Sequence, residues 1–187
     1  MANEAEKTLH EMQQVLTIDA NGAYETEEDK AELLWHELQN AYRSKRILSG
    51  VLSGVEETNS GSIAVVYYKG QRMIIPVSEM ELNLSEQNGY GEMKGRQVRI
   101  LNNMVGCEID FILIALDDTA RSVVASRRLA MLAKRRKFYF PNENGNAQIT
   151  EGRVVQARVI AVAEKVVRLE VFGAECAVPA RDIAWEW

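Results

Sequence analysis

The sequence has few of the residues that enzymes and metal sites most often use. It contains two cysteines and two histidines in 187 residues. Cys107 and Cys176 are too far apart for a metal or redox motif, and we expect them to be small buried apolar residues. His10 and His36 belong to no catalytic pattern. A phosphate-binding glycine loop and a nucleophile elbow are also missing. The sequence therefore predicts a protein that is not an enzyme and that uses no metal or cofactor.

Long hydrophobic runs and a cationic start are also missing. No apolar run approaches the length of a membrane span, and the opening residues MANEAEKTLH are acidic and polar. We therefore expect a cytoplasmic protein that makes no contact with a membrane. Hydrophobic residues make up 47% of the chain and charged residues 26%, which is typical of a chain that buries a core.

Charge is distributed unevenly, although the net charge is only −5. Residues 1–40 carry ten acidic and two basic side chains, whereas the rest of the chain carries 17 acidic and 20 basic ones. Residues 1–26 have few strongly apolar side chains and no sustained periodicity. This composition predicts a disordered acidic head on a mildly basic body.

The next part of the chain divides into a helix, a group of short strands and a second helix. Residues 27–46 have apolar side chains at helical spacing, acids at the start and bases at the end. Residues 47–128 contain five strand-like runs joined by turns. Between the third and fourth runs we expect a polar loop over 78–95 and a short helix over 96–106. A basic helix and a linker are expected over 127–150.

Residues 151–187 repeat the first three of these strands. The stretch 171–183, VFGAECAVPARDI, has the same order of glycine, apolar pair, proline and acid as 68–80, YKGQRMIIPVSEM. Five strands with a helical insert between the third and fourth are the order of an OB-fold barrel. We therefore expect a mainly β protein with flanking helices. It would hold one five-stranded OB-fold barrel and a second, incomplete OB-like repeat of three strands.

The motifs in these strands resemble the RNA-binding domain of the ribosomal protein S-one type. SIAVVYYKGQRMIIPVSEM, residues 62–80, is similar to that family's second and third strands. VGCEIDFILIALDDTARSVVASRR, residues 105–128, is similar to its fourth strand, acidic turn and closing Ser-x-Arg segment. The resemblance covers 46–128 well and 151–185 in part. It implies an OB fold and a role in RNA binding or translation.

The groups with which this family stacks on RNA bases are not kept. Its histidine position falls on Pro76, and its two phenylalanine positions fall on Ser62 and Val65. In the second repeat the equivalent positions are Pro179, Lys165 and Arg168. An apolar-proline pair is similar to the first repeats of the ribosomal protein, whose implied task is docking onto the ribosome and protein partners. Without stacking aromatics, binding to RNA would depend on charge and would be sensitive to salt.

A basic cluster is the strongest surface signal for nucleic acid. Its seven members lie in a stretch without acids: Arg121, Arg127, Arg128, Lys134, Arg135, Arg136 and Lys137. Phe138, Tyr139 and Phe140 follow at once, and basic charge beside aromatics is typical of a nucleic-acid interface. The alternative is a solvated helix face whose aromatics pack against the second repeat.

Further candidates lie on the second and third strands. Tyr67 and Tyr68 are adjacent, so one should be buried and the other exposed for base stacking. Lys69 and Arg72 flank the turn between these strands, where the alternative is a merely solvated turn. Lys165 and Arg168 are the candidates in the second repeat.

We therefore predict a non-catalytic protein that binds RNA, either single-stranded or ribosomal, or a ribosomal protein. RNA contacts would be mainly to phosphates. The alternative is a protein–protein adaptor built on an OB barrel that binds no nucleic acid.

Overall fold

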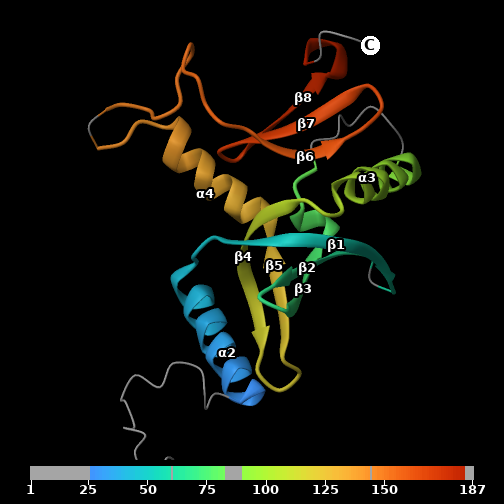
Figure 1. Cartoon of the computed structure of the whole chain (residues 1–187), viewed down its shortest axis with the longest axis vertical. Coiled ribbons are helices and arrows are strands. Elements are labelled where there is room, and N and C mark those ends of the chain that lie inside the picture. The colour runs from blue at the N-terminus through green and yellow to red at the C-terminus, as the bar shows by residue number, and fades with distance from the viewer. Residues whose placement is uncertain (1–25, 60, 83–89, 144, 184–187) are drawn as a thin grey trace, which may run out of the picture. The chain divides into compact units, whose positions relative to one another are not determined.

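The structure of the chain is a computed structural model (Figure 1). The residues that it describes are 26–59, 61–82, 90–143 and 145–183. The acidic head expected over 1–26 therefore lies outside the described residues, apart from Thr26.

Internal contacts divide the chain into two units, residues 1–36 and 37–187. Helix α2 (Glu27–Ser44) begins directly after Thr26, within the expected range 27–46. The Thr26 hydroxyl accepts a hydrogen bond from the Asp29 backbone N–H (3.1 Å), and the Asp29 carboxylate accepts one from the Thr26 N–H (2.9 Å). This reciprocal capping fixes the start of the helix, because each side chain satisfies a backbone donor that the helix leaves open.

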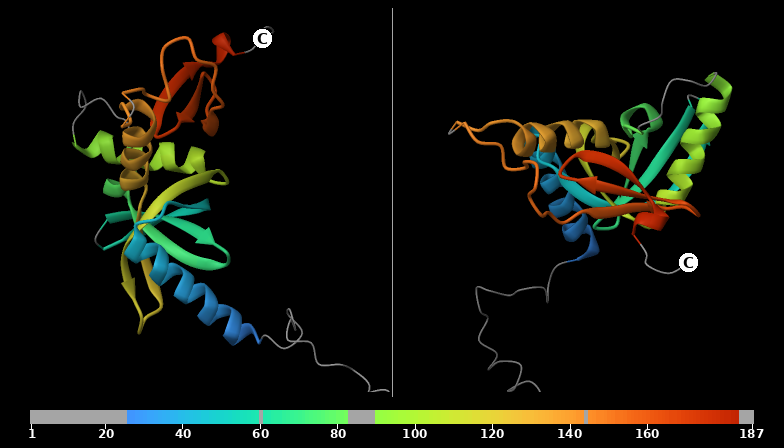
Figure 2. Two further views of the ribbon diagram at one scale, coloured as in Figure 1. Left: turned by 90° about the vertical axis from the view of Figure 1, so that its left-hand side faces the viewer. Right: turned by 90° about the horizontal axis from the view of Figure 1, so that it is seen from above.

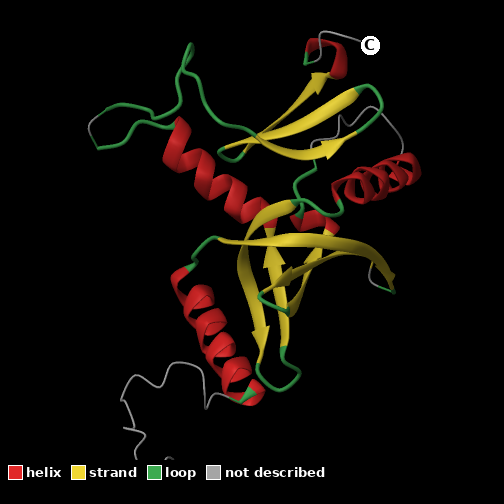
Figure 3. Ribbon diagram, viewed as in Figure 1, coloured by secondary structure: helices red, strands yellow, loops and turns green. Residues whose placement is uncertain are grey.

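Five strands form a sheet in the order β1-β2-β3-β5-β4, which closes on itself because β1 pairs with both β2 and β4 (Figure 3). The strands are β1 (Leu48–Thr58), β2 (Gly61–Tyr68), β3 (Gln71–Pro76), β4 (Glu108–Asp117) and β5 (Ser122–Ser126). All neighbouring pairs are antiparallel except β3 and β5, which are parallel. The prediction of a mainly β protein with five strands in this region is confirmed.

The closed sheet has a fully buried apolar interior. Side chains alternate along each strand, and those that point inward are excluded from solvent. The inward-pointing residues are Leu52, Ala64, Val66, Met73, Ile75, Ile109, Phe111, Leu113 and Ala125. Burial of these side chains, at about 1.5–3 kcal/mol for each large one, is the main favourable contribution to this part of the fold.

Two helices join or follow these strands. Helix α3 (Tyr90–Met104) precedes β4, and helix α4 (Arg127–Tyr139) begins where β5 ends. The expected polar loop over 78–95 is wrong for 90–95, which belong to α3, while 83–89 lie outside the described residues. Two glycines in the first turns lowered the helical signal, but Leu101 and Met104 are completely buried and their packing offsets that cost.

A second sheet has three strands in the order β6-β7-β8: β6 (Arg158–Val162), β7 (Val166–Val171) and β8 (Ala174–Pro179). Its register repeats that of β1, β2 and β3. The β1–β2 pairing shifts by a bulge between Leu52 and Gly54, and the β6–β7 pairing shifts in the same way between Val159 and Ala161. When the two bulges are aligned, each residue of the second sheet has an equivalent residue in the first.

The turns and the prolines of the two sheets are also equivalent in this alignment. Lys69 and Gly70 have φ of 48° and 86°, and Phe172 and Gly173 have φ of 47° and 95°. Two consecutive positive φ angles are typical of the type I′ turn that suits a right-twisted hairpin. Pro76 lies opposite Ile63, as Pro179 lies opposite Val166, and a short 3₁₀ turn follows each proline: η1 (Val77–Glu79) and η2 (Ala180–Asp182). The repeat in the sequence is therefore also a repeat in three-dimensional structure.

Candidate nucleic-acid interface

An exposed tyrosine lies on the outer face of the closed sheet. Tyr67 on β2 lies directly opposite Val51 on β1 and Arg72 on β3. Residues directly opposite in antiparallel strands share a face, and here each member is about half exposed, with Tyr67 at 45%. We call Val51, Tyr67 and Arg72 the Tyr67 row. It presents an aromatic ring and a guanidinium side by side to solvent.

Two further cations lie in turns near the ends of these strands. Lys69 lies in the β2–β3 turn, and Arg121 lies in the β4–β5 turn. The Gln71 side chain donates a hydrogen bond to the Arg121 carbonyl oxygen (3.2 Å), which brings the two turns together. In an OB fold, the face of strands two and three and the loop between strands four and five are where oligonucleotides bind.

Acidic side chains already pair with two of the candidate cations, Lys69 and Arg72. The Lys69 ammonium lies 2.7 Å from Glu37, and the Arg72 guanidinium lies 2.7 Å from Glu56. The pair of Arg72 and Glu56 is exposed, and exposed ion pairs contribute only about 0–1 kcal/mol, so a phosphate can replace the Glu56 carboxylate at little cost. The Glu37 carboxylate is partly buried, although Lys69 itself is exposed. The sequence cluster did not reveal these acids, because they lie on other strands and on α2.

The second tyrosine, Tyr68, is partly buried and is held by the same acid. Its hydroxyl donates to Glu37 Oε1 (2.8 Å), and burial together with this hydrogen bond raises the pKa of Tyr68. The hydrogen bond from Lys69 lowers the pKa of Glu37 despite its partial burial. Of the two adjacent tyrosines, one of which was expected to be buried and one exposed, Tyr67 is the exposed one, whereas Tyr68 is only partly buried.

The family's stacking positions offer no aromatic surface. Ser62 and Val65 are both buried, and Pro76 is partly buried opposite Ile63. Next to the Tyr67 row, the outer face continues with apolar side chains, because Val65 pairs with Ile74. Base stacking contributes about 1–3 kcal/mol per base. Tyr67 is thus the single aromatic ring on this part of the described surface that can supply it.

The basic helix α4 differs from its expected role most clearly at Arg127. This side chain is completely buried, donates to the Met80 carbonyl oxygen (2.8 Å) and pairs with Glu175 (3.3 Å). It joins α4 to both the closed sheet and β8, so it is not available to an RNA ligand. The prediction that Arg127 is a surface residue is therefore wrong. Its acidic partner, Glu175, lies 48 positions later in the sequence, so the cluster itself gave no sign of the pair.

Two more cations of α4 make internal contacts. Lys134 is largely buried and donates to both Asp110 on β4 and Glu170 on β7. Arg135 donates to the Gly173 carbonyl oxygen (2.8 Å) and to Glu81 (2.6 Å). These contacts attach the three-stranded sheet to α4, so Lys134 and Arg135 serve the fold.

The remaining cations of α4 face solvent. Arg128 is about half exposed and pairs with Glu79 (2.8 Å), while Arg136 and Lys137 are exposed. The aromatics after them pack on the second sheet: the Phe138 and Phe172 ring centroids lie 4.5 Å apart, and the Tyr139 hydroxyl donates to the Val171 carbonyl oxygen. This packing is the alternative that the sequence left open for Phe138 and Tyr139.

In the second repeat, the row equivalent to the Tyr67 row is charged and internal. It consists of Arg158, Glu170 and Glu175. Arg158 donates to Asp110 (2.9 Å), whose carboxylate also accepts from Ser49 and Lys134. Burial raises the pKa of Asp110, but these hydrogen bonds outweigh burial and the pKa lies below its usual value. The second repeat thus uses its outer face to pack against the closed sheet and α4.

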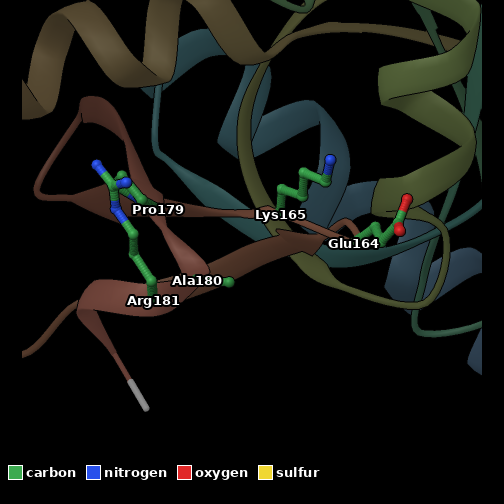
Figure 4. Close-up of a pocket in the computed structure, with 5 residues that line it drawn as sticks. All are labelled: Glu164, Lys165, Pro179, Ala180 and Arg181. Atoms are coloured by element: carbon green, nitrogen blue, oxygen red, sulfur yellow. The ribbon is translucent and has the colours of Figure 1, made fainter. Parts of the chain in front are cut away.

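The two candidates of the second repeat lie apart from each other. Arg168 pairs with Glu175 (2.8 Å) and is mostly buried. Lys165 is exposed in the β6–β7 turn and lines an open pocket of about 290 Å³ with Glu164, Pro179, Ala180 and Arg181 (Figure 4). Two basic side chains, Lys165 and Arg181, and one acidic side chain, Glu164, line this pocket together with the apolar Pro179 and Ala180.

Other classes of site find no support in the part of the chain that the structure describes. There, no group of three or more His, Cys, Asp or Glu side chains is placed to hold a metal ion. None of the described helices has the length and apolarity needed to cross a membrane. No protein-family model matches the chain, and no curated protein matches it.

Proposed function

We propose that the protein binds single-stranded or ribosomal RNA on the outer face of β2 and β3, as an OB barrel of the ribosomal S-one type. The observation that carries the proposal is the Tyr67 row, an exposed tyrosine beside Arg72 on the strands that bind oligonucleotides in OB folds. Lys69 and Arg121 extend the positive charge along both turns. The closed strand order and the parallel β3–β5 pair support the choice of this fold.

The site favours weak, salt-dependent binding. One aromatic ring contributes about 1–3 kcal/mol by stacking, and the remaining contacts are from cations to phosphates. Glu37 and Glu56 already neutralise two of these cations, which reduces the affinity at physiological salt further. RNA binding should therefore depend little on base sequence.

Titration of a fluorescent oligouridine at 50 and 200 mM salt tests the proposal. We expect Tyr67→Ala to weaken binding about 5- to 150-fold and Arg72→Glu to weaken it and reduce the salt dependence. Phe140→Ala and Arg181→Glu are matched controls, because both side chains are exposed away from the Tyr67 row. The proposal fails if the wild-type chain does not bind at 50 mM salt or if the control variants lose as much affinity as the row variants.

A protein–protein adaptor is the second candidate. The partly exposed side chains of Ile63, Ile74 and Pro76 support it, because this apolar surface suits a protein better than a phosphate backbone. Absence of RNA binding at low salt would favour this function.

A further inference from the structure

We infer that the apolar face of the three-stranded sheet binds a β-hairpin supplied by a partner. The face is formed by side chains from all three strands and contains no charged residue. Its members, which we call the open face, are Val159, Val162, Val167, Leu169, Cys176 and Val178. The inference concerns a different surface from the Tyr67 row and does not depend on RNA binding.

The repeat shows that this face corresponds to a barrel interior. Val159, Leu169 and Cys176 lie opposite one another and are equivalent to Leu52, Val66 and Met73. Val162, Val167 and Val178 form the next row and are equivalent to Val55, Ala64 and Ile75. The open face therefore repeats the apolar pattern of the core of the closed sheet.

The open face and the interior of the closed sheet differ in their exposure to solvent. Leu52, Val66 and Met73 are completely buried. Val159, at the position of Leu52, is 51% exposed, and Val162 is 66% exposed. Cys176, at the position of Met73, is also exposed, so the expectation that it is buried is wrong. A contiguous apolar patch of this kind is typical of an interaction site.

The sheet cannot bury this face by turning over. Its opposite face carries Arg158, Glu170 and Glu175, which are held by Asp110, Lys134 and Arg127. Breaking a buried ion pair costs about 3–5 kcal/mol, so these contacts fix the orientation of the sheet. The charged face is directed toward α4 and β4, and the apolar face keeps three exposed members, Val159, Val162 and Cys176, and three partly buried ones.

The closed sheet shows what such a face binds. There, the interior is covered by the hairpin of β4 and β5, which contributes Ile109, Phe111 and Leu113 and pairs with β1 on one side and β3 on the other. In the second sheet, the described residues supply no strand beside β6 or β8 (Figure 2). Both edges thus offer unpaired backbone groups to an added strand.

The area of the face favours a hairpin over a second copy of the chain stacked face to face. Strands of about six residues at ~3.3 Å per residue, spaced ~4.8 Å apart, give a face of about 300 Å². A stable interface buries about 800 Å² on each partner. A hairpin that also pairs with both edges adds backbone hydrogen bonds that stacking alone does not supply.

A synthetic peptide with the sequence of residues 108–126, the β4–β5 hairpin, is the probe, because it covers the equivalent face in the first repeat. It is titrated into the full-length chain, with a peptide of the same composition in scrambled order as control. We expect binding of the hairpin peptide alone, with at least tenfold slower reaction of Cys176 with a thiol reagent. RNA binding should remain unchanged.

The matched variants are Val162→Asp, on the open face, and Val154→Asp, which alters an almost completely exposed valine outside the sheet. The first should weaken peptide binding at least tenfold and the second should not, while both keep the wild-type melting temperature. Absence of peptide binding by the wild-type chain overturns the inference, as does equal loss in both variants. A concentration-dependent dimer that Val162→Asp abolishes would overturn it too and assign the face to a second copy.

Discussion

Replacing Gly173 with alanine tests how closely the second sheet packs on α4. Gly173 lies in the β7–β8 turn at φ 95°, and a Cβ there would lie 2.4 Å from the Met131 carbonyl oxygen and 2.8 Å from Lys134 Cβ. Gly70 occupies the same place in the β2–β3 turn at φ 86°, and a Cβ there would meet nothing within 4 Å. An alanine at either position would have a strained backbone, because φ is positive at both. Only an alanine at position 173 would also overlap with neighbouring atoms.

The structure gives the expected sizes of the two effects. A left-handed conformation costs a non-glycine residue about 1–2 kcal/mol, which should be the whole effect of Gly70→Ala. Gly173→Ala adds an overlap with helix backbone, and overpacking of this kind costs about 1–3 kcal/mol more. Movement of the turn to relieve the overlap would lengthen the hydrogen bond from Arg135 to the Gly173 carbonyl oxygen, which is 2.8 Å.

Urea unfolding, followed by circular dichroism, measures the two free energies of unfolding. We expect Gly173→Ala to be less stable than Gly70→Ala by at least about 1 kcal/mol, with faster hydrogen exchange in β7 and β8 but not in β2 and β3. Equal destabilisation by the two substitutions would refute the close packing of this turn on α4.

Two other substitutions probe the buried charges. Arg127→Met should lower the free energy of unfolding by about 3 kcal/mol, because Glu175 stays buried with Arg168 as its one remaining ion-pair partner among the described residues. Urea unfolding measures this change, and a loss under about 1 kcal/mol would contradict the burial of the pair. Asp110 has a lowered pKa in the folded chain, so its stabilisation is present above the ordinary carboxyl pKa of about 3.9 and is lost as the pH falls through the lowered value. Stability measured from pH 6 to pH 2.5 should therefore fall less steeply for Asp110→Asn than for the wild-type chain, and identical slopes would contradict this assignment.

The strands were predictable from the sequence because their signals are local. β-branched runs, turn residues and the repeated proline predict β1 to β3 and β6 to β8 without tertiary information. Helix α3 was partly missed at Tyr90–Gly95, because its glycines oppose a helix locally and only packing of its last turns compensates.

The candidate site was less predictable, because basic side chains in a sequence do not reveal which acids they meet. Arg127, Lys134 and Arg135 looked like a surface cluster, but their partners lie on β4, on β7 and β8, and after η1. A signal for this was present in Asp110 and Glu170, acids that each stand between two apolar residues within a strand. An acid in such a place needs a buried cation, so each basic residue on a neighbouring helix becomes a candidate partner.

The two repeats use the same structural position for different purposes, and the difference depends on three residues in each. In the first repeat, Val51, Tyr67 and Arg72 keep the outer face open to a ligand. In the second, the equivalent arginine and two glutamates bind Asp110, Lys134 and Arg127, so the outer face is filled by the protein itself. Because that packing directs the second sheet's charged face inward, its apolar face is the exposed one, and we propose that the first repeat binds RNA and the second binds protein.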